Sequence, residues 1–109
     1  MARKHGSTGN AALMAFTRAL GGSSLQHGVR IVAINPGFVE TERLQTMLRK
    51  DAQDKLGDPE RWRELLKDMP LGGPTLPPQI AAMVAFLASD VSCSTSGTVV
   101  TIDKGMVHY

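Results

Sequence analysis

The chain has 109 residues, enough for one small domain, and its 42% hydrophobic and 20% charged residues are typical of a folded globular protein. A net charge of +2, from 12 basic and 10 acidic residues, is too balanced to predict a nucleic-acid partner or an anionic membrane surface. The single cysteine, Cys93, excludes an intrachain disulfide and fits a reducing cytoplasm.

The amino-terminal region lacks the pattern of a leader peptide. Its apolar run, residues 11–16, is shorter than a signal-peptide core and continues directly into Thr17 and Arg18. No apolar run approaches the roughly 18 residues that a membrane-spanning helix needs. We therefore expect a cytoplasmic protein with neither a membrane nor a nucleic-acid partner.

Residues 10–26 are predicted to form a helix. Its apolar residues cover nearly the whole circumference, and such a helix is buried on more than one side. Gly28 is expected to end it, because glycine readily adopts the left-handed conformation found after many helices.

Residues 29–34 are predicted to form a strand inside a parallel sheet, because they are short, β-branched and mostly apolar on both faces. Asn35-Pro36-Gly37 ends this strand sharply. Thr41 is expected to cap a following helix, whose shared face carries Leu44, Met47 and Leu48.

Gly57-Asp58-Pro59 breaks the chain, and Asp58 as cap with Pro59 at the first helical position starts another helix. That helix carries one apolar stripe: Trp62, Leu65, Leu66 and Met69. Residues 70–78 are predicted to be an irregular loop, because they hold four prolines and two glycines.

Pro78 is expected to open a further amphipathic helix, with Ile80, Met83, Val84 and Leu87 on one face. Residues 89–97 are predicted to be a loop, and residues 98–102 a second β-branched strand. Two buried-type strands joined by a long helical crossover indicate a parallel pair. Two such strands do not make a self-sufficient sheet, so we interpret residues 1–109 as a single α/β domain segment belonging to a larger, doubly wound, Rossmann-like parallel sheet.

Three stretches of the sequence carry a further pattern. Residues 10–21 read NAALMAFTRALG, residues 28–41 read GVRIVAINPGFVET, and PLGG at 70–73 precedes PQIAAMVAFLASD at 78–90 and GTVVTID at 97–103. In order and spacing they resemble the carboxyl-terminal part of the short-chain dehydrogenase/reductase family. By this resemblance, residues 10–21 correspond to the helix after the catalytic tyrosine, and residues 28–41 correspond to the sixth strand with its Pro-Gly turn. The third stretch corresponds to the last helix and the seventh strand.

The resemblance implies a Tyr-x-x-x-Lys pair for acid–base catalysis, with the lysine just before Ala11. Asn10 stands at the lysine position and Gly6 at the tyrosine position, so we assign no catalytic residue to this chain. Asn10 is still able to hydrogen-bond a cofactor ribose, but it brings no charge to stabilise a phenolate. His5 and Ser7 lie near the vacant position, and we interpret them as part of an irregular chain start.

The resemblance also implies NAD or NADP as cofactor, bound at the turn after the first strand. Pro36 and Gly37 would let the backbone pass close to the nicotinamide ring, while the Val39 backbone and the Thr41 hydroxyl would bind its carboxamide. The alternative is that Pro36-Gly37 only ends a strand and Thr41 only caps a helix. No glycine-rich phosphate-binding turn follows a strand in the sequence, and Gly21-Gly22 and Gly72-Gly73 are interpreted as a helix end and a loop.

Residues 40–78 correspond to a substrate-loop-like helical insertion, whose apolar stripe either lines a substrate pocket or forms helix core. Its arginines either meet an anionic substrate or form a solvated face, and we favour the solvated face: Arg43, Arg49, Arg61 and Arg63. No histidine, cysteine and carboxylate spacing predicts a metal site. We expect homo-oligomers through helix 10–26 and the carboxyl-terminal strand. Three functions stay open: the terminal part of an NAD(P)-dependent oxidoreductase, inactive alone; a non-catalytic oligomerisation or binding module; and a truncated gene product.

Overall fold

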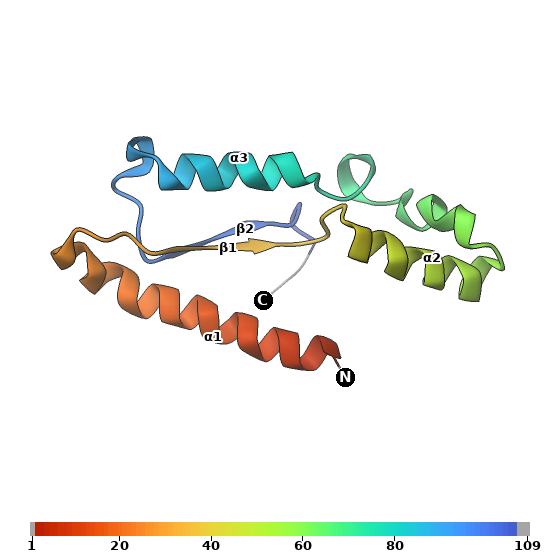
Figure 1. Cartoon of the computed structure of the whole chain (residues 1–109), viewed down its shortest axis with the longest axis horizontal. Helices are drawn as coiled ribbons and strands as arrows, with labels where there is room; N and C mark the ends of the chain where they lie inside the picture. Colours follow the sequence, from red (N-terminus) through yellow and green to blue (C-terminus); the bar gives the residue numbers. More distant parts are fainter. Residues whose placement is uncertain (1, 107–109) are drawn as a thin grey trace. The chain divides into compact units, whose positions relative to one another are not determined.

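The computed structural model describes the backbone of residues 2–106 and the side chains of residues 8–106. Its regular elements are α1 (Ala2–Ser23), β1 (Val32–Pro36), α2 (Glu42–Leu56), α3 (Pro77–Ala88) and β2 (Thr98–Ile102) (Figure 1). Four 3-10 helices join them: η1 (Ser24–His27), η2 (Pro59–Leu66), η3 (Pro70–Gly72) and η4 (Asp90–Ser92).

The described residues form two compact units. The first comprises residues 2–35 and 82–101, and the second comprises residues 36–81 and 102–106. The division falls where β1 ends, so α1 and nearly all of the sheet belong to the first unit, while α2, η2 and η3 belong to the second. The single-domain interpretation of residues 1–109 stays a prediction.

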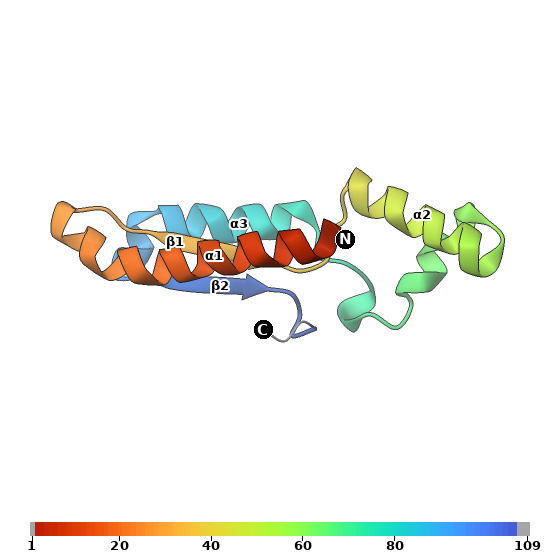
Figure 2. The same ribbon diagram turned by 90° about the horizontal axis from the view of Figure 1, so that it is seen from below.

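β1 and β2 pair as parallel neighbours, which confirms the predicted strand pair and its α/β class (Figure 2). In the first unit, α1 covers one face of this pair and residues 82–88 of α3 cover the other (Figure 1). This is the layering of a doubly wound parallel sheet, in which helices lie on both faces.

β1 begins at Val32, three residues later than predicted. The three residues before it make hydrogen bonds to loops instead: the Val29 N–H donates to the Ser24 carbonyl at 3.2 Å, and the Ile31 N–H donates to Ser96 Oγ at 3.1 Å. The Gly97 N–H in turn donates to the Ile31 carbonyl at 2.8 Å. Apolar, β-branched composition predicted the strand, but these distant partners decide where it starts.

α1 begins at Ala2, eight residues before the predicted start, so the expected irregular chain start is wrong for the backbone there. The side chains of His5 and Ser7 lie outside the described ones. At the other end, η1 continues the turn and Gly28 follows with φ of 71°, which confirms the left-handed stop.

The expected burial of α1 on more than one side is wrong within the described residues. Its large apolar side chains are exposed, by 62% at Leu13 and 56% at Phe16, whereas Thr17 and Gly21 are buried. α1 meets the rest of its unit through small residues: a Cβ built at Gly21 would lie 2.1 Å from the Gly97 Cα. Ser96 Oγ donates to the Gly21 carbonyl at 2.5 Å in the same contact.

In the second unit, α2 begins and ends as predicted from local hydrogen bonding. Thr41 Oγ1 accepts from the Leu44 N–H at 3.2 Å, and Gly57 follows the helix with φ of 73°. Leu44 and Ala52 are buried on this helix, whereas Met47, predicted to lie on the same face as Leu44, is 37% exposed.

The segment after α2 is a 3-10 helix and not the predicted α-helix. Asp58 caps it, because its Oδ1 accepts from the Glu60 N–H at 2.9 Å, but the backbone kinks at Arg61 and the helix ends at Leu66. Trp62 is the buried anchor, at 5% exposure, and arginine guanidinium groups of Arg49 and Arg63 lie 6.0 and 4.4 Å from its ring centre.

α3 begins at Pro77, one residue before the prediction, and Gln79 Oε1 accepts from the Leu76 N–H at 2.8 Å as in a capping box. Its carboxyl end is held by Arg30. This guanidinium donates to the Leu87 carbonyl at 2.8 Å and the Ser89 carbonyl at 3.0 Å, and it also reaches the Ser92 carbonyl. A cation at this position also suits the negative end of the helix dipole.

Candidate functional site at the carboxyl end of the strands

The turn that follows β1 is built by close backbone packing. The Gly37 N–H donates to the Ile102 carbonyl at 2.9 Å, which continues the pairing of the strands into the second unit. A Cβ at Gly37 would lie 2.6 Å from the Asp103 Cβ, so only glycine fits there without a shift. The predicted need for glycine is thus met, but its observed reason is the neighbouring residue Asp103.

Val39 forms an isolated parallel bridge with Thr75. The Glu40 N–H donates to the Thr75 carbonyl, and the Thr75 N–H donates to the Phe38 carbonyl, both at 2.8 Å. In such a parallel bridge the two flanking residues bond to the partner residue, and the N–H and carbonyl of the residue between them point to the opposite side. The Val39 N–H and carbonyl are therefore directed away from Thr75, in a fixed orientation.

Thr41 lies two residues further on, at the first turn of α2. Its side-chain oxygen is occupied as the acceptor of the capping bond from Leu44. A hydroxyl has one proton to donate as well as lone pairs to accept with, so capping leaves the Thr41 O–H available as a donor.

Pro36, Gly37, Val39 and Thr41 lie in one continuous turn of the second unit, and Pro36 is the last residue of β1. Asn10 does not join them in the same unit. It lies on α1 with an exposed side chain, and the structure leaves its position relative to the turn open.

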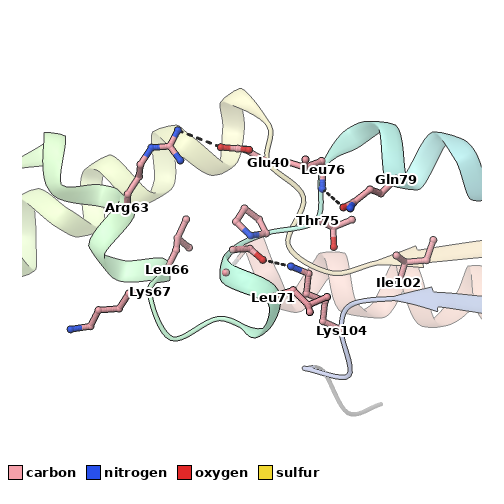
Figure 3. Close-up of a pocket in the computed structure, with 13 residues that line it drawn as sticks. Glu40, Arg63, Leu66, Lys67, Leu71, Thr75, Leu76, Gln79, Ile102 and Lys104 are labelled. Atoms are coloured by element: carbon pink, nitrogen blue, oxygen red, sulfur yellow. Dashed lines mark hydrogen bonds and ion pairs between the residues drawn. The ribbon is translucent and has the colours of Figure 1, made fainter.

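A pocket of about 610 Å³ opens beside this turn, entirely within the second unit (Figure 3). Glu40 and Thr75 line it on the side of the turn, and Leu66 and Leu71 line it from the segment between α2 and α3. This volume lies in the range of small-molecule sites.

Charged side chains of both signs line the pocket, with three basic residues and one acidic residue: Arg63, Lys67, Lys104 and Glu40. The Lys104 ammonium donates to the Pro70 carbonyl at 3.0 Å and also to the Gly73 carbonyl, so it holds the loop that forms one wall. Figure 3 shows the Lys67 ammonium pointing away from the other labelled residues, while Arg63 and Glu40 face one another.

Thr75 and Lys104 were missed by sequence reasoning. Thr75 lies in the proline-rich segment that was expected to be irregular, and its bridge to Val39 is a long-range contact that no local pattern signals. Arg63 was considered as a contact for an anionic substrate, but a solvated face was favoured.

Arg61 and Glu64, an exposed ion pair on η2, shift each other's pKa. The hydrogen bond from Arg61 lowers the pKa of Glu64, and the same contact raises the pKa of Arg61. Neither residue lines the pocket, so this pair has no part in its chemistry.

Neither a metal centre nor a membrane span is present in the part of the chain that the structure describes. No group of three or more His, Cys, Asp or Glu side chains there could hold a metal ion. In the same residues, no helix combines the length and apolarity needed to cross a bilayer.

Comparison with known proteins places this geometry in a family. Residues 6–107 match the profile of the family described as Enoyl-(Acyl carrier protein) reductase. The oxidoreductase UcpA of Salmonella typhimurium is 36% identical over 96 residues, which cover 87% of this chain and 35% of that protein.

Solved structures of short-chain dehydrogenases and reductases resemble the chain in fold. A short chain dehydrogenase family protein from Francisella tularensis superposes with a TM-score of 0.75 at 28% identity, over 87% of this chain and 40% of that one. L-sorbose reductase from Gluconobacter frateurii, complexed with NADPH and L-sorbose, superposes with a TM-score of 0.78 at 25% identity, over 91% of this chain and 38% of that one.

The chain therefore belongs to the short-chain dehydrogenase/reductase family, as its sequence resemblance indicated. It spans about 35% of the length of the curated relatives that it matches.

Proposed function

We propose that this chain is the carboxyl-terminal part of an NAD(P)-dependent oxidoreductase, in which it supplies the nicotinamide turn and the substrate-binding segment. The observation that carries this proposal is the bridge between Val39 and Thr75, which fixes the Val39 backbone groups at the carboxyl end of a parallel strand. Open α/β sheets bind ligands at this end of their strands.

The residues of the turn fit the nicotinamide end of the cofactor. A carboxamide has one donor and one acceptor group, and the Val39 N–H and carbonyl together with the Thr41 hydroxyl offer the complementary set. When bound, the cofactor supplies the hydride that a substrate carbonyl carbon accepts, while the carbonyl oxygen takes a proton to give the alcohol. Within the proposal, Pro36 and Gly37 shape the turn, and Asn10 stays a predicted contact of the cofactor ribose.

The phosphate end of the cofactor lacks an equivalent partner among the described residues. Gly21-Gly22 lies inside α1, while Gly72 ends η3 and Gly73 follows it, so neither pair joins a strand to the start of a helix. With Gly6 and Asn10 at the acid–base positions, we propose that the chain alone binds the cofactor weakly and does not catalyse hydride transfer. The cytoplasmic location stays a prediction.

Residues 40–78 are the proposed substrate-binding segment. Ten of the thirteen residues lining the pocket fall between Glu40 and Leu76, and the others are Gln79, Ile102 and Lys104. The pocket shares Glu40 with the turn, between Val39 and Thr41, which would bring a substrate next to the nicotinamide.

A titration followed by nuclear magnetic resonance tests the cofactor proposal on the full chain. Adding NADH should shift the backbone amide signals of Val39, Glu40 and Thr41 more than those of α3. NADPH should shift the same amide signals, because the two cofactors share the nicotinamide end. Shifts confined to other segments would contradict the proposal.

A second candidate function, assembly into homo-oligomers, is favoured by a separate observation. Leu13, Phe16 and Leu20 of α1 are 62%, 56% and 39% exposed, and their spacing places them on one side of the helix, as at an interaction surface. We propose that a second copy of the chain covers this helix, with the edge strand β2 as a further contact.

A further inference from the structure

The pocket of the second unit combines apolar walls with one available cation at its rim. Leu66, Leu71, Leu76 and Ile102 supply the apolar lining. Of the basic residues that line it, Lys104 is bound to loop carbonyls and Lys67 points outward (Figure 3). Arg63 is left as the cation that a ligand in this pocket would meet.

Trp62 holds the Arg63 guanidinium in place. The guanidinium carbon lies 4.4 Å from the centre of the Trp62 ring, and Trp62 itself is buried at 5% exposure. Stacking on an immobile aromatic ring orients the planar guanidinium before any ligand arrives, so less side-chain entropy is lost when a ligand binds.

Glu40 occupies only part of the hydrogen-bonding capacity of Arg63. The Arg63 Nη2 to Glu40 Oε1 distance is 3.7 Å, an ion pair longer than a hydrogen bond. A guanidinium has five N–H donors, and none of the hydrogen bonds recorded among the described residues is donated by Arg63.

Exposure decides which charge an incoming ligand meets. The Arg63 side chain is 71% exposed and the Glu40 side chain is 23% exposed, so the carboxylate is largely covered and the guanidinium faces solvent. One edge of the guanidinium can stay beside Glu40 while another edge donates two hydrogen bonds to a second carboxylate.

We propose that Arg63 is the specificity-determining residue of this pocket and that the substrate carries a carboxylate on an apolar body. The carboxylate pairs with Arg63, and the apolar part lies against Leu66, Leu71 and Ile102. The inference rests on the proposed function in so far as it makes residues 40–78 the substrate segment, and it adds the chemical class of that substrate.

The test is a binding titration of the full chain with hexanoate, with hexanamide as the neutral analogue of the same size. Trp62 is the only tryptophan in the chain, so its indole N–H gives one resolved signal beside Arg63. The expected result is a saturable shift of that signal with hexanoate and binding of hexanamide that is weaker by roughly tenfold or more, as loss of a charged hydrogen bond implies.

Two variants separate the role of Arg63 from a general charge effect. Arg63→Gln should weaken hexanoate binding by roughly tenfold or more. Arg49→Gln is the matched control, because Arg49 also lies over Trp62, at 6.0 Å, but does not line the pocket. Its hexanoate affinity should stay within about twofold of the parent chain. Calorimetry on the same variants gives the affinity without relying on the Trp62 signal.

Equal binding of hexanoate and hexanamide, unchanged affinity in Arg63→Gln, or tighter binding of hexyl phosphate than of hexanoate would overturn the proposal. The cofactor titration is a separate measurement on the same chain. Hexanoate binding without NADH shifts at Val39 and Thr41 would leave the pocket assignment standing and remove the oxidoreductase proposal. NADH shifts at these residues without hexanoate binding would leave the oxidoreductase proposal standing and remove the pocket assignment.

Discussion

At the scale of single residues, glycines mark the closest contacts in each unit. Gly21 meets Gly97 in the first unit and Gly37 meets Asp103 in the second, and at both a Cβ would lie under 3 Å from a neighbour. Sequence reasoning interpreted Gly21 as part of a helix end and Gly37 as a turn next to a ligand. Neither interpretation identified the residue that packs against the glycine. A local pattern indicates only a turn or a helix end, and the segment in contact lies far away in the sequence.

Gly21 and Gly22 provide a matched pair for testing this packing. A Cβ at Gly21 would lie 2.1 Å from the Gly97 Cα, whereas a Cβ at Gly22 would meet nothing within 4 Å. Gly21→Ala should lower the free energy of unfolding by about 1–3 kcal/mol through overpacking. Gly22→Ala should raise it by up to about 1 kcal/mol, because alanine favours the helix. Urea unfolding followed by circular dichroism measures both, and similar effects of the two changes would refute the packing argument.

At the scale of elements, the capped helix ends and the strand β2 could be predicted, whereas the starts of α1 and β1 could not. Thr41, Asp58 and Gly57 act as the local patterns indicated, because a cap bonds to groups only two to four residues away. The start of β1 depends on Ser24 and Ser96, and no pattern within residues 29–34 reports those contacts.

The same distinction applies to the candidate site. The turn at Pro36-Gly37 and the cap at Thr41 could be predicted from sequence, while their role as a cofactor site stays a prediction. The bridge to Thr75 and the stacking of Arg63 over Trp62 could not be predicted, since η2 was expected to be a regular α-helix and instead kinks at Arg61. A kink changes which side chains face one another, and periodicity alone does not detect it.

Thr41 caps α2 and is also a proposed hydrogen-bond donor to the nicotinamide carboxamide, and substitutions separate these two roles. Thr41→Asp keeps a good capping acceptor but removes the hydroxyl donor, so α2 should keep its stability while NADH shifts at the turn are lost. Thr41→Ser should preserve both properties. Thr41→Ala should lose the cap as well, at a cost of about 1 kcal/mol in unfolding free energy. If Thr41→Asp responds to NADH like the parent chain, the hydroxyl is not a ligand.

At the scale of the whole molecule, the chain leaves much apolar surface in water. Four hydrophobic side chains make up the buried core of the described residues, namely Leu44, Ala52, Trp62 and Leu87, while large apolar side chains of α1 and α3 are exposed. A parallel pair covered by one helix on each face is a section of a doubly wound sheet, and its remaining edge and helix faces call for partners.

Self-association through α1 follows from that surface. Light scattering over a range of concentrations should show oligomers of the parent chain, and Phe16→Lys should shift them toward monomers. Met47→Lys is the matched control on α2, at 37% exposure, and should leave the oligomeric state unchanged. A parent chain that stays monomeric at high concentration would end the assembly proposal.

The most direct test of the account is contact between the nicotinamide and the turn after β1. Intermolecular nuclear Overhauser effects between nicotinamide ring protons of NADH and the methyl groups of Val39 and Thr41 measure that contact. The account predicts such effects for both residues. Effects at α1 or α3 only, with none at Val39 and Thr41, would contradict it.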